Sequence, residues 1–300
     1  MTPLAFLLIV FSAGLHASWN LMAKRSSMCI AFYAVLALFS CMVWQHVWFW
    51  TPVHYFSLPP LFYLCIAGVI CCEGIYCTWL AKTYRTMEIS TAYPMMRALP
   101  LIIIPVITAL TGWGKPLSFC AVSGLLIVFT GCLLMPLKDF SDFHLKNYIN
   151  KRMLSILLVA CGIAGYTILD SQGQAVLRSA YPELSKLTVS LSYYVFRGTL
   201  LTIVLFAVLF NNREERKNLA EYIRKRNWVP ALAGIFSSLT YSSVLVAMNY
   251  VTNVTYVQIF RQMGLVIGVA GGIIILKERC TATKITGVTL ILLGLAVSVL

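Results

Sequence analysis

The sequence predicts an all-α membrane protein with ten transmembrane helices. Three observations predict this fold class. The 300-residue chain is 60% hydrophobic, it is only 11% charged, and its apolar residues gather in ten long runs. A soluble domain carries roughly 25% charged residues, so this chain has too few charges to cover a folded surface in water. A bilayer core about 30 Å thick needs a helix of roughly 20 apolar residues.

The ten apolar runs follow one another along the chain, with short loops between most of them. They are too long for strands and lack the period-two alternation of a barrel. The first run has no basic segment before it, so we interpret it as a retained helix rather than a signal peptide. We expect spans at residues 3–23, 29–50, 61–81, 88–110, 117–136, 153–171, 188–210, 229–249, 254–276 and 284–300.

Two connections are longer and basic. Residues 138–152 mix charges with aromatic side chains, which predicts a segment lying along the membrane interface. Residues 211–228 are strongly charged and predict a helix in water.

The positive charges predict an orientation. The formal net charge is +13, and outside the spans 17 Lys and Arg fall in odd-numbered loops but only 3 in even-numbered loops. Surplus basic residues mark cytoplasmic loops, so this distribution predicts that both termini lie outside. We therefore interpret the charge as setting topology, and we expect no nucleic-acid partner.

The two halves of the chain resemble each other. When the segment from Tyr93 is aligned with the segment from Val257, Arg97 falls opposite Arg261. Because five helices is an odd number, a tandem copy enters the membrane in the opposite direction. We predict two inverted five-helix repeats, residues 1–136 and 153–300, joined by an interfacial linker at 137–152. In transporters with such repeats the substrate site lies where the repeats meet.

Ionisable residues inside the spans are few, and such residues are costly and usually functional. Most share a helix face with polar or aromatic neighbours at a spacing of three or four, so we predict that these faces line one aqueous cavity. The expected substrate-binding residues are Trp19, Asn20, Tyr93, Arg97, Tyr166, Tyr193, Arg197, Gln258, Arg261 and Gln262. The expected coupling or protonation residues are His16, Glu73 and Asp170.

Each of these assignments has a structural alternative. Arg197 pairs with Asp170 or Glu73 as a plain ion bridge, or it binds substrate. Arg97 and Arg261 have a symmetric structural role, or they bind an acidic group through their forked donors. His16 packs a helix interface, or it carries a proton.

The fourth and ninth spans are irregular in different ways. The fourth carries Pro94, Pro100 and Pro105, which bend a helix, and the ninth carries several glycines. We expect gating or cavity helices here, the alternative being that these residues only kink and pack. Two interpretations are open for a set of four glycines: they form a homodimer seam, or they pack within one chain. These glycines are Gly124, Gly131, Gly287 and Gly294.

Motifs for catalysis or metal binding are missing. The ten cysteines mostly lie in apolar runs without the spacing of metal ligands, and no HExxH, GxSxG or paired Asp motif occurs. We predict that the chain is not an enzyme and that it binds neither cofactor nor metal.

The chain resembles the drug/metabolite transporter superfamily in its EamA-like branch. The junction KERCTATKITGVTLILLGLAV is similar to that branch's pattern of Glu278, Gly287 and Gly294, although Lys115 departs from it in the first half. LHASWNLMAKRS and GYTILDSQG are similar to a bacterial subgroup. The resemblance implies alternating-access transport in a bacterial cytoplasmic (inner) membrane. It also implies both termini inside, against the charge count.

We therefore predict a secondary active transporter of a small anionic or zwitterionic metabolite, working by export or exchange and coupled to protons. The charge sum of the buried groups, three Arg against two carboxylates, favours an acidic substrate. The alternatives are an exporter of organic cations or amphipathic compounds, a passive channel, and a receptor that binds without transport.

Overall fold

The protein is all-α throughout the part that the computed structural model describes, namely residues 2–23, 29–86, 89–137, 139–142, 153–276 and 280–300. The side chains of 19–23, 84–86, 89–91, 272 and 275–276 are outside that description. Within these residues, six helical stretches are long and apolar enough to cross a membrane, with Ile30–Trp50 counted as one stretch, and three shorter helices are apolar along their length. The chain is therefore a multi-pass membrane protein.

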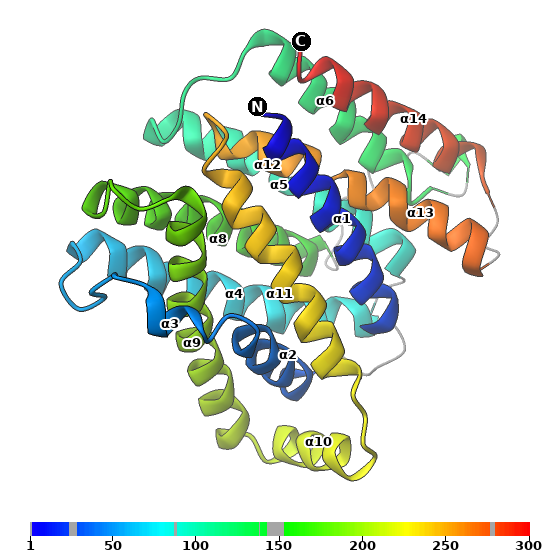
Figure 1. The fold of residues 1–300 in the computed structure, drawn as a ribbon. Helices are drawn as coiled ribbons and strands as arrows, with labels where there is room; N and C mark the ends of the chain where they lie inside the picture. Colours follow the sequence, from blue (N-terminus) through cyan, green and yellow to red (C-terminus); the bar gives the residue numbers. More distant parts are fainter. Residues whose placement is uncertain (1, 24–28, 87–88, 138, 143–152, 277–279) are drawn as a thin grey trace.

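The helices follow the predicted spans closely in most places (Figure 1). The predicted water-exposed helix is confirmed as α10. The elements are α1 (Pro3–Ala23), α2 (Ile30–Met42), α3 (Val47–Trp50), α4 (Pro60–Thr86), α5 (Ile89–Thr111), α6 (Phe119–Leu134), the short 3-10 helix η1 (Phe140–Asp142), α8 (Met153–Ala180), α9 (Lys186–Asn211), α10 (Arg213–Arg224), α11 (Val229–Met248), α12 (Val254–Phe260), α13 (Met263–Leu276) and α14 (Ala282–Val297). Residues 143–152 of the predicted linker lie outside the described residues.

Two predicted spans are not single helices, which corrects the sequence prediction. The run 29–50 divides at a turn over residues 43–46 into α2 and α3, and the run 254–276 divides at Arg261 into α12 and α13. At the second break the backbone N–H of Gln262 bonds the carbonyl of Ile259, one residue nearer than in an α-helix. The Gln262 side-chain amide then donates to the Gln258 carbonyl at 3.1 Å. The side chain thus satisfies a carbonyl that the break leaves free.

The three prolines of the fourth span do not divide it, because α5 runs through all of them. Proline removes one backbone donor from a helix, and side chains supply donors nearby. Thr108 Oγ1 donates to the carbonyl of Pro105 at 3.1 Å, and Gln262 Nε2 of the broken helix donates to the carbonyl of Arg97 at 3.3 Å. These two side-chain hydrogen bonds add contacts along the proline-containing helix.

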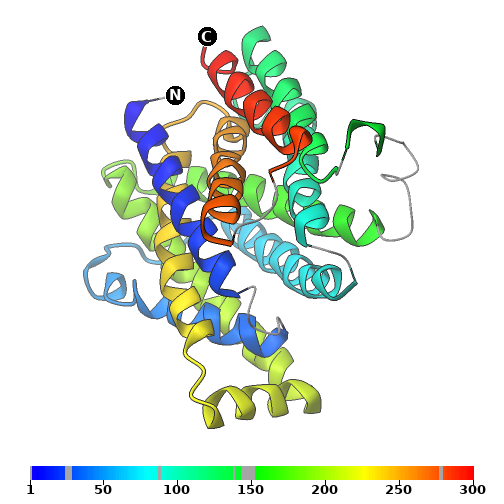
Figure 2. The same cartoon turned by 90° about the vertical axis from the view of Figure 1, so that its right-hand side faces the viewer.

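Helices from the two halves of the chain pack against each other in pairs. α4 lies along α8, α1 lies along α11, and α6 lies along α14. Figures 1 and 2 show the last pair side by side in both views, and they show the start of α1 near the end of α14. α10 lies at the far end of the molecule from this pair.

Glycines bring α6 and α14 into backbone contact. A Cβ atom on Gly124 would lie 2.5 Å from the carbonyl oxygen of Gly294, and one on Gly131 would lie 2.7 Å from that of Gly287. The reverse contacts are equally close, at 2.6 Å and 2.8 Å. These glycines therefore pack within one chain, which decides between the two alternatives that the sequence left open.

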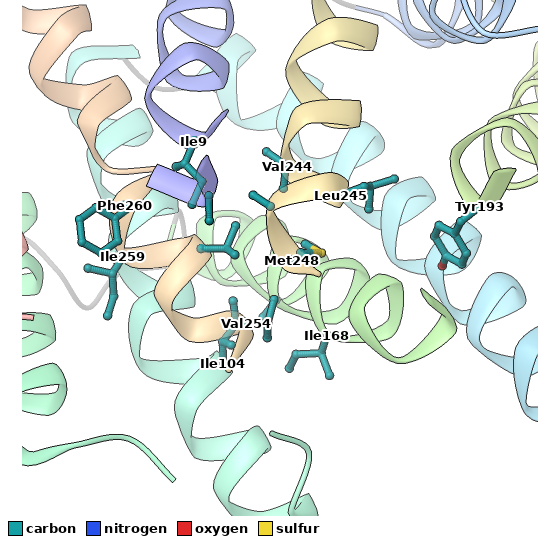
Figure 3. Packing of buried hydrophobic residues seen from close by; sticks show 14 of the residues in the cluster. Ile9, Ile104, Ile168, Tyr193, Val244, Leu245, Met248, Val254, Ile259 and Phe260 are labelled. Atoms are coloured by element: carbon teal, nitrogen blue, oxygen red, sulfur yellow. The ribbon is translucent and has the colours of Figure 1, made fainter. Parts of the chain in front are cut away.

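A cluster of buried apolar side chains fills the space between α1, α5, α8, α11 and α12 (Figure 3). Dense packing of this kind excludes water. The labelled members from these helices are Ile9, Ile104, Ile168, Val244, Leu245, Met248, Val254, Ile259 and Phe260.

The amphipathic helix α10 is tied to the start of α2. Asn212 caps α10 by accepting from the backbone N–H of Glu214 at 2.9 Å. The carboxylate of Glu215, which is buried although α10 is mostly exposed, accepts from the backbone N–H of Ala31 at 2.9 Å. A carboxylate at a helix N-terminus satisfies a free donor and complements the helix dipole. α10 therefore holds the end of α2 in place.

We predict that Gly124→Ala destabilises the protein, because the new methyl group meets the α14 backbone. Overpacking of this kind costs about 1–3 kcal/mol, which lowers the unfolding midpoint in detergent. Gly14→Ala is the matched control, since a Cβ there meets nothing within 4 Å. Equal midpoints for the two variants would contradict the close contact.

Candidate functional site

Three charged side chains from three helices meet in the middle of the protein. Arg197 of α9 lies between two carboxylates, with Nη2 at 2.5 Å from Oε1 of Glu73 on α4 and Nε at 3.0 Å from Oδ1 of Asp170 on α8. Arg197 is 4% exposed and Asp170 is fully buried. The alternative of an ion bridge is thus confirmed, with both carboxylates as partners. Burial of a charge is expensive unless it is paired and hydrogen-bonded.

Two tyrosines complete the shell around Asp170. Tyr193 donates its hydroxyl to Oδ1 at 2.9 Å, and Tyr241 of α11 donates a short hydrogen bond to Oδ2. The Arg197 guanidinium lies 4.8 Å from the centre of the Tyr241 ring, within range of a cation–π contact. We name Glu73, Asp170, Tyr193, Arg197 and Tyr241 the ion cluster. It joins four helices through polar contacts.

A cavity of about 110 Å³ lies beside the ion cluster. This main cavity is walled by six helices and the α12–α13 break. Its volume is well below the roughly 300–1,000 Å³ of sites for drug-sized ligands, so it suits a small ligand. The polar and aromatic side chains that line it are His16, Tyr33, Ser40, Glu73, Tyr76, Tyr166, Tyr194, Arg197, Ser237, Thr240, Tyr241 and Arg261.

A smaller cavity of about 20 Å³, here called the arginine pocket, shares part of this wall. Arg97 and Tyr93 of α5 line it, and His16, Tyr166 and Arg261 line both spaces. Arg97 donates to the hydroxyl of Tyr93 at 3.4 Å, a long hydrogen bond. Arg261 therefore stands at the junction of the two cavities.

Arg97 and Arg261 differ from Arg197 in their surroundings. They are 4% and 5% exposed, and within the described part of the chain neither lies in a salt bridge. Nε of Arg97 and Nη1 of Arg261 are buried without a hydrogen-bond partner among the described residues. Buried guanidinium donors without acceptors are costly, so both groups are suited to receive an anion.

The break between α12 and α13 places Arg261 at the cavity wall. Arg261 is the C-cap of α12, which ends at Phe260, and Gln262 lies in the turn before α13 begins at Met263. In transporters, interrupted helices of this kind line substrate and ion sites. Gln258 and Gln262 are fully buried and line neither cavity. The side-chain amide of Gln262 donates to the backbone carbonyls of Arg97 and Gln258.

A second polar group closes the opposite end of the site. Ser190 donates to Gln174 at 3.0 Å, and Asn249 Nδ2 donates to both at 2.8 Å and 2.7 Å. Arg178 adds a short hydrogen bond to Asn249 Oδ1. We name these four residues the Asn249 cluster. The ion cluster and the Asn249 cluster lie one after the other along α8. On this helix Tyr166, Asp170, Gln174 and Arg178 are spaced four residues apart, so their side chains share one face.

The structure brings most of the predicted site residues together, with clear exceptions. Tyr193 and Asp170 line neither cavity, Gln258 lies within α12, and Gln262 lies in the break. The side chains of Trp19 and Asn20 in α1 lie outside the described residues. The residues that line a cavity are His16, Glu73, Tyr93, Arg97, Tyr166, Arg197 and Arg261.

Sequence reasoning missed Tyr241 and the Asn249 cluster. Tyr241 lies in the run SSLTYSS, which carries no ionisable acid or base, so a search for buried charges passes over it. The four-residue repeat along α8 was readable in the sequence, since Tyr166 and Asp170 already define that face. Extending it by two turns finds Gln174 and Arg178.

Fold and site together define a class: a multi-pass helical membrane protein with a small polar cavity at its centre. Residues 37–300 match the family described as "Sugar transport protein". The chain belongs to this family of membrane transporters, which is related to the drug/metabolite transporter superfamily. It is thus a transporter and not an enzyme, and the EamA-like branch stays a prediction.

Solved structures share the fold. One, titled "Crystal structure of protein", has a TM-score of 0.67 and 14% sequence identity, and the match covers 98% of this chain and 95% of that one. This similarity concerns the fold alone. A comparison with curated proteins found no match.

We predict that Arg197→Met strongly destabilises the protein, because it leaves two buried carboxylates without a counter-charge. Breaking a buried pair costs about 3–5 kcal/mol, which detergent-solubilised protein reports as a lower unfolding midpoint. Arg213→Met, at an exposed position of α10, is the control and changes stability by no more than about 0.5 kcal/mol. Similar midpoints for both variants would show that the ion cluster is dispensable.

Proposed function

We propose that the protein is a secondary active transporter that moves a small sugar carrying an anionic or zwitterionic group, by alternating access. Membership of the sugar transport protein family supports the sugar. The observation that carries the acidic group is the pair Arg97 and Arg261, two buried arginines at a cavity with no carboxylate partner in the described part of the chain.

The proposed architecture is ten spans in two inverted repeats. In such an arrangement, a contact between the first helix of one repeat and the third helix of the other occurs twice, with the two repeats exchanged. The pairs α1 with α11 and α8 with α4 agree with this rule. The glycine contacts agree as well, since exchanging Gly124 for Gly287 and Gly294 for Gly131 turns one contact into the other. The closeness of the chain ends agrees with an even number of crossings (Figures 1 and 2).

The acid group of the substrate binds between Arg97 and Arg261. Guanidinium groups recognise carboxylate and phosphate through two parallel hydrogen bonds. The unpartnered donors of both arginines and their shared pocket support this placement. Arg197 is already shared by two carboxylates, so we assign it to holding the site together.

The remainder of the sugar occupies the main cavity. Tyrosine rings offer flat apolar faces, and their hydroxyls both donate and accept hydrogen bonds. Tyr33, Tyr76, Tyr166 and Tyr241 surround the space, with Ser40 and Thr240 nearby. Sugars present hydroxyls at the rim and C–H groups on their faces, which such a lining complements.

The cavity lies on the cytoplasmic side of the ion cluster in this proposal. Its lining residues on α9 run from Tyr194 to Leu205, toward the end where the basic helix α10 begins. The charge rule places basic segments in the cytoplasm. The Asn249 cluster and the apolar cluster of Figure 3 close the outer side, so the arrangement corresponds to an inward-facing state that supports exchange or export.

We predict that proteoliposomes containing the protein exchange labelled glucuronate for unlabelled glucuronate. Glucose, which carries a hydroxymethyl group in place of the carboxylate, exchanges far more slowly, because it brings no negative charge to the two arginines. Arg97→Ala abolishes glucuronate exchange, whereas Arg97→Lys retains part of it through the charge. Unfolding midpoints measured on the same samples show that both variants fold.

Two results would contradict this assignment. Undiminished exchange by Arg97→Ala would remove the arginine from the site. Exchange of glucose or of an organic cation without glucuronate would mean that the arginines are structural, and flux that never responds to a counter-substrate would favour a channel.

A further inference from the structure

We propose that Glu73 carries the coupling proton of transport while Asp170 remains charged throughout the cycle. This inference rests on the proposed function, because it names how that site couples to protons. The argument starts from the two carboxylates, which share Arg197 but have different surroundings.

Asp170 already accepts hydrogen bonds on both of its carboxylate oxygens. Its Oδ1 accepts from Tyr193 at 2.9 Å and from Arg197 at 3.0 Å, and its Oδ2 accepts from Tyr241. A proton on Oδ1 would compete with two donors, and a proton on Oδ2 would require the Tyr241 hydroxyl to turn from donor to acceptor. Its side chain is also fully buried and lines neither cavity. Asp170 is therefore suited to a constant negative charge.

Glu73 is placed differently on each count. It lines the main cavity and is 16% exposed. The printed contact with Arg197 joins its Nη2 to Oε1, whereas Oε2 is buried without a hydrogen-bond partner among the described residues. A proton on Oε2 displaces no existing donor, and it gives that oxygen a hydrogen to donate. The geometry thus separates a fixed charge from a variable one.

Other titratable and charged groups face Glu73 from the helices packed around it. The nearest charges are Arg197 and Asp170, and Arg261 stands across the cavity. None of the remaining groups is a carboxyl. They are His16 of α1, Tyr33 and Cys41 of α2, Tyr76 and Cys77 of α4, Tyr166 of α8, Tyr194 of α9 and Tyr241 of α11. A carboxyl signal from this region therefore belongs to Glu73 or Asp170.

Protonation of Glu73 changes the charge that an anionic substrate meets. A hydronium ion in the cavity gives one proton to the carboxylate and becomes water, and Glu73 becomes a neutral acid with no other bond altered. Glu73, Asp170 and Arg197 then sum to zero instead of one negative charge. Because like charges repel strongly in a low-dielectric site, losing this charge favours anion binding. By linkage, the bound anion favours the proton equally, so both move in the same direction.

The first test measures the proton directly on the whole protein in detergent, without any substrate. Infrared difference spectra between about pH 8 and pH 5 report the carbonyl stretch of a carboxyl that gains a proton inside the protein. We expect this band in the wild type and in Glu183→Gln, an exposed control, and its loss in Glu73→Gln. A band that persists in Glu73→Gln, or no such band in the wild type, overturns the proposal.

The second test measures glucuronate binding over the same pH range, in which a free carboxyl of this kind stays ionised. We expect wild-type protein to bind at least about fivefold more tightly at the acidic end. Glu73→Gln, which mimics the protonated acid, binds at both ends with the tight, acidic value. A merely structural glutamate would not produce this pattern.

Histidine also titrates in this range, so His16→Gln is the competing variant. Loss of the pH dependence in His16→Gln, with retention in Glu73→Gln, overturns the assignment to Glu73. If wild-type protein binds no glucuronate at either pH, the proposed substrate fails, and the infrared band still decides whether Glu73 takes the proton. The two failures are therefore distinguishable.

Discussion

The site depends on one interaction, the sharing of Arg197 between Glu73 and Asp170. Three charges inside a membrane protein are costly unless they satisfy one another. Here they do so across α4, α8 and α9, and the tyrosine donors add α11 through Tyr241. The ion cluster thereby fixes the positions of four helices from both halves of the chain. The main cavity lies beside it and is lined by Glu73, Arg197 and Tyr241 of the ion cluster.

The uncompensated charge of the two remaining arginines is a consequence of this arrangement. With both buried carboxylates engaged by Arg197, Arg97 and Arg261 have no counter-charge in the described part of the chain, although both are buried at a shared pocket. The break between α12 and α13 contributes to this, since it brings Arg261 to the cavity wall and uses Gln262 to satisfy the freed backbone. Family membership is the reason for proposing a sugar as the substrate. The uncompensated positive charge is the reason for proposing that this sugar carries an acid group.

Much of this was predictable from the sequence, because long apolar runs and rare buried charges are strong signals. The runs located most helix ends to within a few residues, although α8 continues to Ala180, nine residues beyond the predicted end at 171. A search for intramembrane charge found every ionic member of the ion cluster. The breaks at residues 43–46 and Arg261 were not predictable, since they depend on side chains such as Gln262 bonding across to α5. Tyr241 was missed because it is neutral. Its role as a hydrogen-bond donor becomes visible only once the structure shows the surroundings of Asp170. The glycine seam was ambiguous until the contacts placed Gly124 on Gly294.

The central claim is that an acidic sugar is held by Arg97 and Arg261, which have no carboxylate partner in the described part of the chain, while Arg197 keeps the helices together. A structure of the protein determined with glucuronate bound tests it most directly. The account predicts the carboxylate between Arg97 and Arg261, the sugar ring among the tyrosines of the main cavity, and Arg197 still in contact with Glu73 and Asp170. A carboxylate bound to Arg197 in place of its two partners, or a ligand outside both cavities, would contradict it.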